Sequence, residues 1–89
     1  MTEDACYEWD DLLGSLRAVI IGVSDALPEQ DLTNAWELLE AGEPGIALQN
    51  LCTRLYEYDA TLDPEVVEQI RRLAIAMSLD PERVLRGLQ

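Results

Sequence analysis

The feature that most constrains the fold of this chain is the short segment Gly42-Glu43-Pro44. Glycine just past a helix tolerates a left-handed backbone, and proline at the first position of a helix gives up an N–H that would have no partner there. One helix is therefore expected to end at Gly42 and the next to begin at Glu43 or Pro44. Because the joint is short, the two helices should lie roughly antiparallel.

The other prolines also stand at expected helix starts. Pro28 is followed by Glu29 and Asp31, first-turn acids that the helix dipole favours. Asp63-Pro64-Glu65 and Asp80-Pro81-Glu82 each combine an N-cap carboxylate, a first-position proline and a first-turn acid. With a first helix from about residue 5 to 23, the predicted helices cover residues 5–23, 28–42, 44–57, 64–78 and 81–88.

Apolar residues recur at helical spacing along each of these segments, whereas strand alternation and hairpin dipeptides are absent from the sequence. The predicted fold class is all-α: a small antiparallel bundle of four helices plus a short C-terminal helix, in one domain of residues 1–89. The residues expected to face inward are Trp9, Leu12, Leu13, Leu16, Val19, Ile20, Val23, Leu32, Ala35, Trp36, Leu39, Ala47, Leu48, Leu51, Cys52, Leu55, Val66, Val67, Ile70, Leu73, Ala74, Met77, Val84, Leu85 and Leu88.

Charge is the strongest compositional constraint on function. The chain has 18 Asp and Glu against 6 basic residues, a formal net charge of −12, and every basic residue is Arg. Phosphates would repel such a domain, so direct binding of DNA or RNA is not expected. A negative surface instead raises the encounter rate with a basic protein. The plain alternative is an acidic domain that its charge keeps in solution.

The sequence contains few of the side chains that usually act in catalysis. The chain contains no His and no Lys, the usual general base and the Schiff-base amine. Ser15, Ser24 and Ser78 have no base partner, and Cys6 or Cys52 would need a nearby cation that only Arg supplies. We therefore expect no enzyme and no cofactor. The two cysteines are expected to fill the core rather than to form a disulfide.

A carboxylate metal site has to be weighed against this background. Glu37, Glu40 and Glu43 are spaced three apart, but a glycine breaks the helix before Glu43, and no calcium-loop pattern is present. Solvated surface carboxylates are the favoured interpretation.

An acyl carrier protein would match the size, charge and helicity of the chain. That role needs a serine at the start of a helix in an Asp-Ser-Leu setting. Ser24 is followed rather than preceded by aspartate, and Ser78 falls at the end of a predicted helix. The carrier therefore remains a disfavoured alternative.

No apolar run approaches the roughly 18 residues of a membrane span. The chain opens with Thr2-Glu3-Asp4, unlike the basic start of a signal peptide. We expect a cytoplasmic protein with no membrane partner.

The segment from Glu40 to Asp59 also resembles a known family. Glu40-x-Gly42-Glu43, Ala47-Leu48-x-x-Leu51-Cys52 and Leu55-Tyr56-Glu57-Tyr58-Asp59 are similar to the core of the Maf-type immunity proteins, antidotes to polymorphic toxins. A looser similarity runs from Leu27 to Leu79. The resemblance implies a monomer that forms a heterodimer with the C-terminal toxin domain of its own producer or of kin cells. Such toxins are often nucleases, with a ribonuclease favoured over a deoxyribonuclease.

The resemblance and the charge together single out candidate partner-binding residues. A nuclease site is lined with basic groups that hold phosphate, so an acidic patch can occupy the same ground. The candidates lie at the Gly42 corner and at the far end of the third helix, with two flanking acids. They are Glu37, Glu40, Glu43, Glu57, Tyr58, Asp59 and Asp63.

Several of these residues also have an ordinary structural interpretation. Glu43 is equally well placed to cap the third helix with its side chain. Tyr56 and Tyr58 point about 200° apart on a helix, so at least one is expected to pack against the bundle, with Tyr58 the more exposed.

Two broader alternatives remain open. In the first, the motif residues serve only to hold the helices of the bundle in place, and other surface residues select the toxin. The runner-up interface then consists of the N-terminal acids Glu3, Asp4, Glu8, Asp10 and Asp11. The alternative outside immunity is a small acidic adaptor that binds a basic helix or domain unrelated to toxins.

Overall fold

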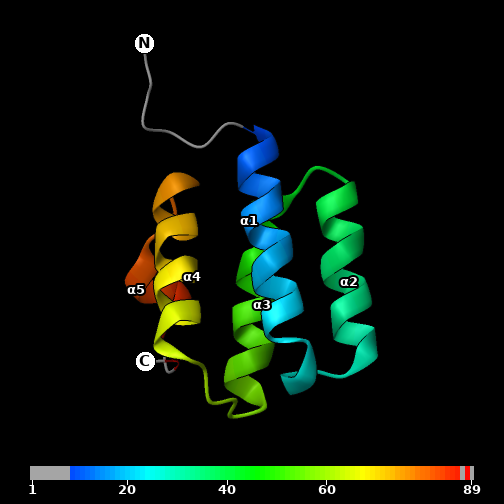
Figure 1. The fold of residues 1–89 in the computed structure, drawn as a ribbon, viewed down its shortest axis with the longest axis vertical. Coiled ribbons are helices and arrows are strands. Elements are labelled where there is room, and N and C mark those ends of the chain that lie inside the picture. Colours follow the sequence, from blue (N-terminus) through cyan, green and yellow to red (C-terminus); the bar gives the residue numbers. More distant parts are fainter. Residues whose placement is uncertain (1–8, 87, 89) are drawn as a thin grey trace.

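The computed structural model describes residues 9–86 and Leu88, with side chains from Asp11 onward. These residues form five α-helices and no strand, as the all-α prediction requires (Figure 1). The helices, with a short 3-10 turn η1 between the first two, are α1 (Trp9–Gly22), η1 (Ser24–Ala26), α2 (Glu29–Glu40), α3 (Pro44–Glu57), α4 (Pro64–Ala76) and α5 (Pro81–Val84).

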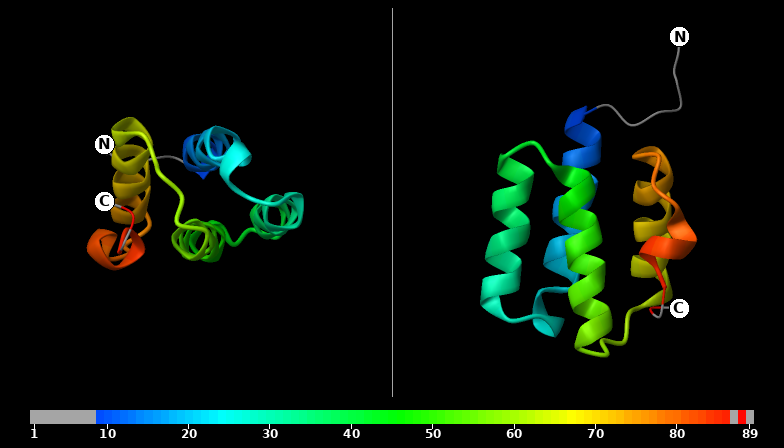
Figure 2. Two further views of the ribbon diagram at one scale, coloured as in Figure 1. Left: turned by 90° about the horizontal axis from the view of Figure 1, so that it is seen from below. Right: turned by 180° about the vertical axis from the view of Figure 1, so that it is seen from behind.

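The first four helices run alternately down and up the long axis, so each is antiparallel to the one before it (Figure 1). Seen from the end, α1 and α3 occupy the middle, α2 lies on one side, and α4 and α5 lie on the other (Figure 2). The most extensive contacts join α2 to α3, α1 to α4 and α4 to α5. None of the described helices has the length and apolar character that a bilayer span requires.

The core is aliphatic, and the described residues include no buried polar or charged side chain. Nearly every predicted inward position is buried or partly buried; the side chain of Trp9 lies outside the described residues. Leu27 is also buried. Helical spacing did not predict this, because Leu27 lies in the connection between α1 and α2 and not within a helix. The buried hydrophobic residues of the core are Leu12, Leu16, Val19, Ile20, Val23, Leu27, Ala35, Leu39, Ala47, Leu48, Leu51, Cys52, Leu55, Ile70, Leu73, Ala74, Leu85 and Leu88.

The last helix is shorter than predicted. α5 ends at Val84 instead of continuing through Leu88. Leu85 and Leu88 follow in turns, and the Leu88 N–H donates to the Leu85 carbonyl oxygen at 2.9 Å. Both side chains are still buried, because a turn presents them to the core as well as a helix would.

The predicted stop at Gly42 is confirmed in detail. Its φ of 80° lies in the left-handed region. The Gly42 N–H donates to the Leu39 carbonyl (3.0 Å) and the Glu43 N–H donates to the Leu38 carbonyl (2.9 Å). This pair of bonds is the Schellman motif, which satisfies carbonyls that the helix end would leave unpaired.

α3 and α4 end in the same motif, but with non-glycine residues at the left-handed position. Asp59 has φ 55° and Ser78 has φ 61°. The Ala60 N–H, for example, donates to the Leu55 carbonyl at 3.0 Å, and an equivalent pair of bonds closes α4. A side chain at positive φ is strained, although aspartate tolerates it better than most residues.

At these three positions we expect substitutions to change the free energy of unfolding in opposite directions. Asp59→Gly and Ser78→Gly are each expected to stabilise the protein by about 0.5–1 kcal/mol, and Gly42→Ala to destabilise it by about 1 kcal/mol. A Cβ at Gly42 meets nothing within 4 Å, so the loss reports backbone conformation alone. Urea unfolding measures the free energies. Gly45→Ala, inside α3 with equally open space, is the control and should not destabilise; a neutral Gly42→Ala would contradict the argument.

Candidate protein-binding surface

The predicted partner-binding residues lie at opposite ends of the bundle. α3 separates the two groups, and its 14 residues span about 20 Å at roughly 1.5 Å per residue. The structure therefore does not bring all seven residues together (Figure 1). We call Glu37, Glu40 and Glu43, at the α2–α3 joint, the corner cluster, and Glu57, Tyr58, Asp59 and Asp63, at the α3–α4 connection, the end cluster.

All seven side chains are exposed, and the end cluster has a second tyrosine beside it. Tyr56 is 58% exposed and Tyr58 is 51% exposed. The prediction that at least one of them packs against the bundle is wrong, and so is the expectation that Tyr58 is the more exposed of the two. Residues such as Leu55 already fill the inward face of α3, and Tyr56 is turned about 100° away from Leu55. Tyr58 follows the last residue of α3 and is free to point into solvent.

The helix-capping roles expected from the sequence are only partly realised. Oδ1 of Asp80 accepts a hydrogen bond from the Glu82 N–H at 3.0 Å, as predicted for α5. Asp63 and Glu43 occupy the N-cap positions of α4 and α3, but neither side chain makes a capping hydrogen bond. For Glu43 the reason is length and backbone, since good caps are short side chains on extended residues and Glu43 has ψ 61°. Both carboxylates stay exposed to solvent.

Two members of the end cluster have structural roles of their own. Oε1 of Glu57 accepts a hydrogen bond from Nη1 of Arg54 at 2.7 Å. Asp59 adopts the left-handed backbone conformation that ends α3. Among the described residues, no hydrogen bond or ion pair reaches the side chain of Tyr58 or Asp63. These two are therefore the members of the cluster with no described structural task.

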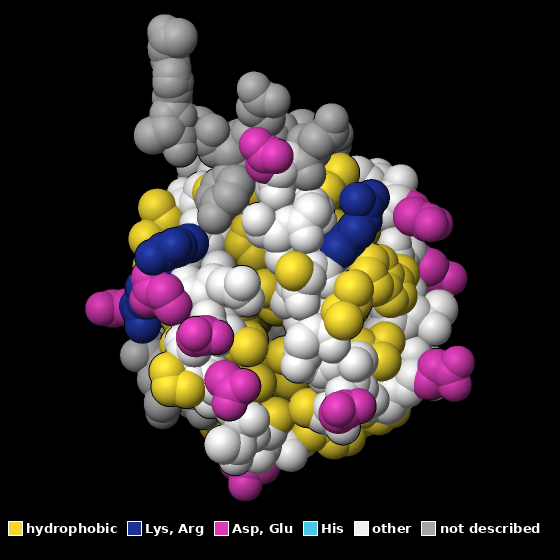
Figure 3. All heavy atoms as spheres, viewed as in Figure 1, with side chains coloured by type: hydrophobic (Ala, Val, Ile, Leu, Met, Phe, Trp, Pro, Cys, Tyr) yellow, Lys and Arg dark blue, Asp and Glu magenta, His cyan; other side chains and the backbone are white. Residues whose placement is uncertain are grey.

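Most of the acidic surface has no nearby guanidinium. Arg71 and Arg72 both pair with Glu68, at 3.7 and 3.2 Å, and Arg54 pairs with Asp31 and Glu57. On the face in Figure 3, acidic side chains are spread over most of the surface, and several of them lie close together. Within the described part of the chain, the carboxylates without an Arg partner are Asp11, Asp25, Glu29, Glu37, Glu40, Glu43, Asp59, Asp63, Glu65, Asp80 and Glu82.

The runner-up interface is only partly visible. Glu3, Asp4 and Glu8, like Cys6, lie outside the described residues, as does the side chain of Asp10. Asp11 is exposed on the first turns of α1.

Tertiary packing brings Asp25 close to the end cluster. A hollow of about 230 Å³ has Asp25 and Asp63 among its lining residues, together with apolar side chains that include Val23, Leu62 and Val66. The sequence offered no signal for this pairing, because Asp25 belongs to the α1–α2 connection and Asp63 to the α3–α4 connection. Only the packing of α1 on α4 brings the two connections together.

The remaining candidate chemistries find no site in the described residues. No three His, Cys, Asp or Glu side chains among them are grouped to hold a metal ion. The Ser24 hydroxyl donates to the Ile21 carbonyl at 2.8 Å, and Ser78 comes after the end of α4, not at a helix start. Cys52 is buried, and burial raises the pKa of its thiol from 9.0 to about 12, so it stays protonated and unreactive.

The fold and the surface define the class of protein: a small all-α bundle with an aliphatic core and an acidic surface on which most described carboxylates have no Arg partner. No protein-family model, no curated protein and no solved structure matches this chain.

Proposed function

We propose that this protein is an immunity protein that binds a basic toxin domain and neutralises it. The toxin is expected to be a nuclease, with a ribonuclease favoured over a deoxyribonuclease, and the complex a heterodimer in the cytoplasm. One observation carries the proposal: beside exposed tyrosines, the described surface holds many carboxylates with no Arg within 4 Å. Such a surface is complementary to one that binds phosphate.

The physical argument separates encounter from affinity. Unpaired surface carboxylates attract a basic partner over a distance and speed association, but exposed charges at the rim of an interface add little affinity. Affinity comes from a few central side chains, among which Tyr is enriched. The proposed complex therefore needs both an acidic field and an aromatic anchor.

The end cluster supplies both, and we place the centre of the interface there. Tyr56 and Tyr58 are more than half exposed, and the hollow lined by Asp25 and Asp63 lies at the same end of the bundle. The corner cluster offers carboxylates, the exposed Ile46 and the partly buried Trp36, but among the described residues no aromatic side chain there is as exposed as the two tyrosines. We assign the corner cluster to steering.

The test begins with co-purification of this protein and the polypeptide encoded immediately upstream of it. A nuclease assay of that polypeptide, with and without this protein, measures neutralisation. A stable complex with loss of nuclease activity supports the proposal. Without a complex and without rescue of cells that express the upstream polypeptide, the proposal fails, and the acidic adaptor becomes the better description.

Two matched sets of substitutions then locate the interface, each removing three negative charges. The end set is expected to weaken the complex by at least about tenfold, mainly through faster dissociation, whereas the corner set should mainly slow association. Asparagine at residue 59 preserves tolerance of the left-handed backbone. The end set is Asp25→Asn, Asp59→Asn and Asp63→Asn; the corner set is Glu37→Gln, Glu40→Gln and Glu43→Gln.

Surface plasmon resonance at two salt concentrations separates the two rates. If the corner set raises the dissociation rate and the end set does not, the interface lies at the α2–α3 joint. If neither set changes binding, the interface is elsewhere and the N-terminal acids become the first choice.

A further inference from the structure

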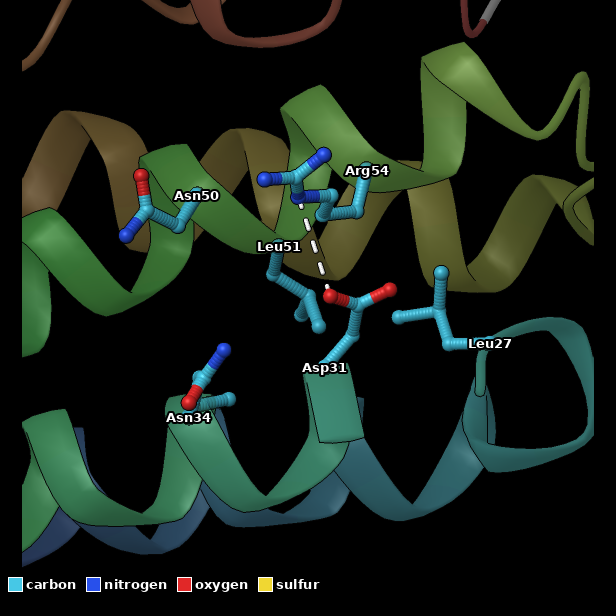
Figure 4. Close-up of a pocket in the computed structure, with 7 residues that line it drawn as sticks. Leu27, Asp31, Asn34, Asn50, Leu51 and Arg54 are labelled. Atoms are coloured by element: carbon cyan, nitrogen blue, oxygen red, sulfur yellow. Dashed lines mark ion pairs between the residues drawn. The ribbon is translucent and has the colours of Figure 1, made fainter. Parts of the chain in front are cut away.

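A second, smaller hollow lies between α2 and α3 (Figure 4). It encloses about 90 Å³, several times the roughly 10–15 Å³ that one water molecule needs. Its polar lining comes from both helices: Asp31 and Asn34 from α2, and Asn50 and Arg54 from α3. Asp31 and Arg54 lie in the first turn of α2 and the last turn of α3, so the hollow adjoins the end of the bundle that carries Glu57.

The carboxylate of Asp31 is poorly satisfied. Its side chain is only 14% exposed, and the closest described cation is Nε of Arg54, at 3.7 Å from Oδ1. That distance is too long for a hydrogen bond. Arg54 makes its close contact with Glu57 instead, at 2.7 Å. Two carboxylates thus share one guanidinium, and only one of them, Asp31, lines the hollow.

The two asparagines leave further hydrogen-bonding capacity in the same place. In Figure 4 the side chains of Asn34 and Asn50 stand on opposite sides of the space between α2 and α3. No hydrogen bond from the described residues involves either carboxamide. Each amide oxygen can accept two hydrogen bonds. The Asp31 carboxylate is mostly buried without a hydrogen bond from the described residues, and the two exposed amides beside it are free to accept, so a partner that donates hydrogen bonds suits this place.

We propose that this hollow is a socket for one basic side chain of the bound partner, a Lys ammonium or an Arg guanidinium. Because Arg54 makes its hydrogen bond with Glu57, which does not line the hollow, the carboxylate of Asp31 remains available to attract a cation. The acceptors of Asp31, Asn34 and Asn50 match the N–H groups of such a cation. Leu27 and Leu51, which also line the hollow, suit the methylene stem of such a side chain. The chemistry of the socket stands on these residues alone; that its occupant belongs to a toxin rests on the proposed function.

Small cations test the socket without any partner. In ¹H–¹⁵N spectra of the full chain, n-propylguanidinium and n-butylammonium are each expected to shift the side-chain amide signals of Asn34 and Asn50, and the shifts should saturate. Propionate, an anion of similar size, should leave them unchanged. Shifts that rise linearly without saturation, or that follow propionate equally, would overturn the proposal and leave a hollow that holds only water.

Two variants with opposite expected effects on cation binding make the test more specific. Asp31→Asn keeps the shape but removes the charge, and it should weaken cation binding about tenfold. Glu29→Gln is the matched control, because it removes another carboxylate from the first turn of α2 outside the hollow, and it should leave binding unchanged. Arg54→Gln removes the competing guanidinium and should strengthen cation binding. If Arg54→Gln abolishes binding instead, Arg54 itself is the ligand-binding group and the proposal is wrong.

The same variants connect the socket to the partner. If the upstream polypeptide forms the complex, Asp31→Asn should weaken it while Glu29→Gln does not. A complex that is indifferent to Asp31→Asn keeps the proposed function but removes the socket from the interface. Saturable cation binding without any toxin complex supports the socket and counts against the toxin.

Discussion

Leu48→Ala is expected to destabilise the protein by about 2–5 kcal/mol, the range for a buried leucine whose cavity collapses only in part. Leu48 is 0% exposed and lies in α3, the helix that contacts α1, α2, α4 and α5. A domain of this size has only about 5–15 kcal/mol of stability in total. The substitution should therefore remove a large share of it, and the midpoint of urea unfolding followed by far-ultraviolet circular dichroism measures the change.

The neighbouring residue provides the control. Gln49 is exposed on the same helix, and alanine has the higher helix propensity, so Gln49→Ala should change the stability by less than about 0.5 kcal/mol. If Leu48→Ala costs less than 1 kcal/mol, α3 does not form the centre of the core in solution, and the packing described above is wrong there.

Stability is also expected to fall steeply in alkaline solution because of Cys52. Burial raises the pKa of its thiol from 9.0 to about 12 in the folded protein. The folded state thus disfavours the thiolate. Below pH 9 the thiol is protonated in both the folded and the unfolded state, so the folded protein keeps its full stability. Between pH 9 and 12 the unfolded state loses the proton while the folded state keeps it, so the free energy of unfolding falls. The slope from this one group approaches about 1.4 kcal/mol per pH unit.

The measurement compares wild type with Cys52→Ala in urea between pH 7 and 11. The variant should be less stable at pH 7, because it leaves a cavity, but it should lose stability more slowly above pH 9. Cys6 is present in both proteins, so its titration cancels in the comparison. Parallel curves for the two proteins would contradict a buried thiol at this position.

The helix boundaries show which features the sequence could predict. The Gly42 stop and the Pro44 start appear in the structure at those residues, because both depend on backbone properties of single residues. The ends of α3 and α4 were harder to read in the sequence. They use the same motif with Asp59 and Ser78 in the glycine position, and neither residue is a strong signal of a left-handed backbone.

The side chains show the same division. Helical spacing predicted the inward faces, including Leu48, Leu51 and Leu55 on α3. It could not predict that both Tyr56 and Tyr58 would be exposed, because periodicity says which face a residue occupies but not whether a neighbouring element covers that face. By contrast, Arg71 and Arg72 pair with Glu68 three and four residues earlier on α4, a local contact that helical spacing alone explains.

The sequence by itself determined the acidic charge, the helices and their apolar faces, because charge is a sum over residues and helices form from contacts a few residues apart. Only the tertiary structure decided which acids meet. It separates Glu43 from Asp63 by the length of α3, and it places Asp31 beside Arg54. Those arrangements depend on how whole helices pack against one another, and no local pattern in the chain encodes the distance between residues from different helices.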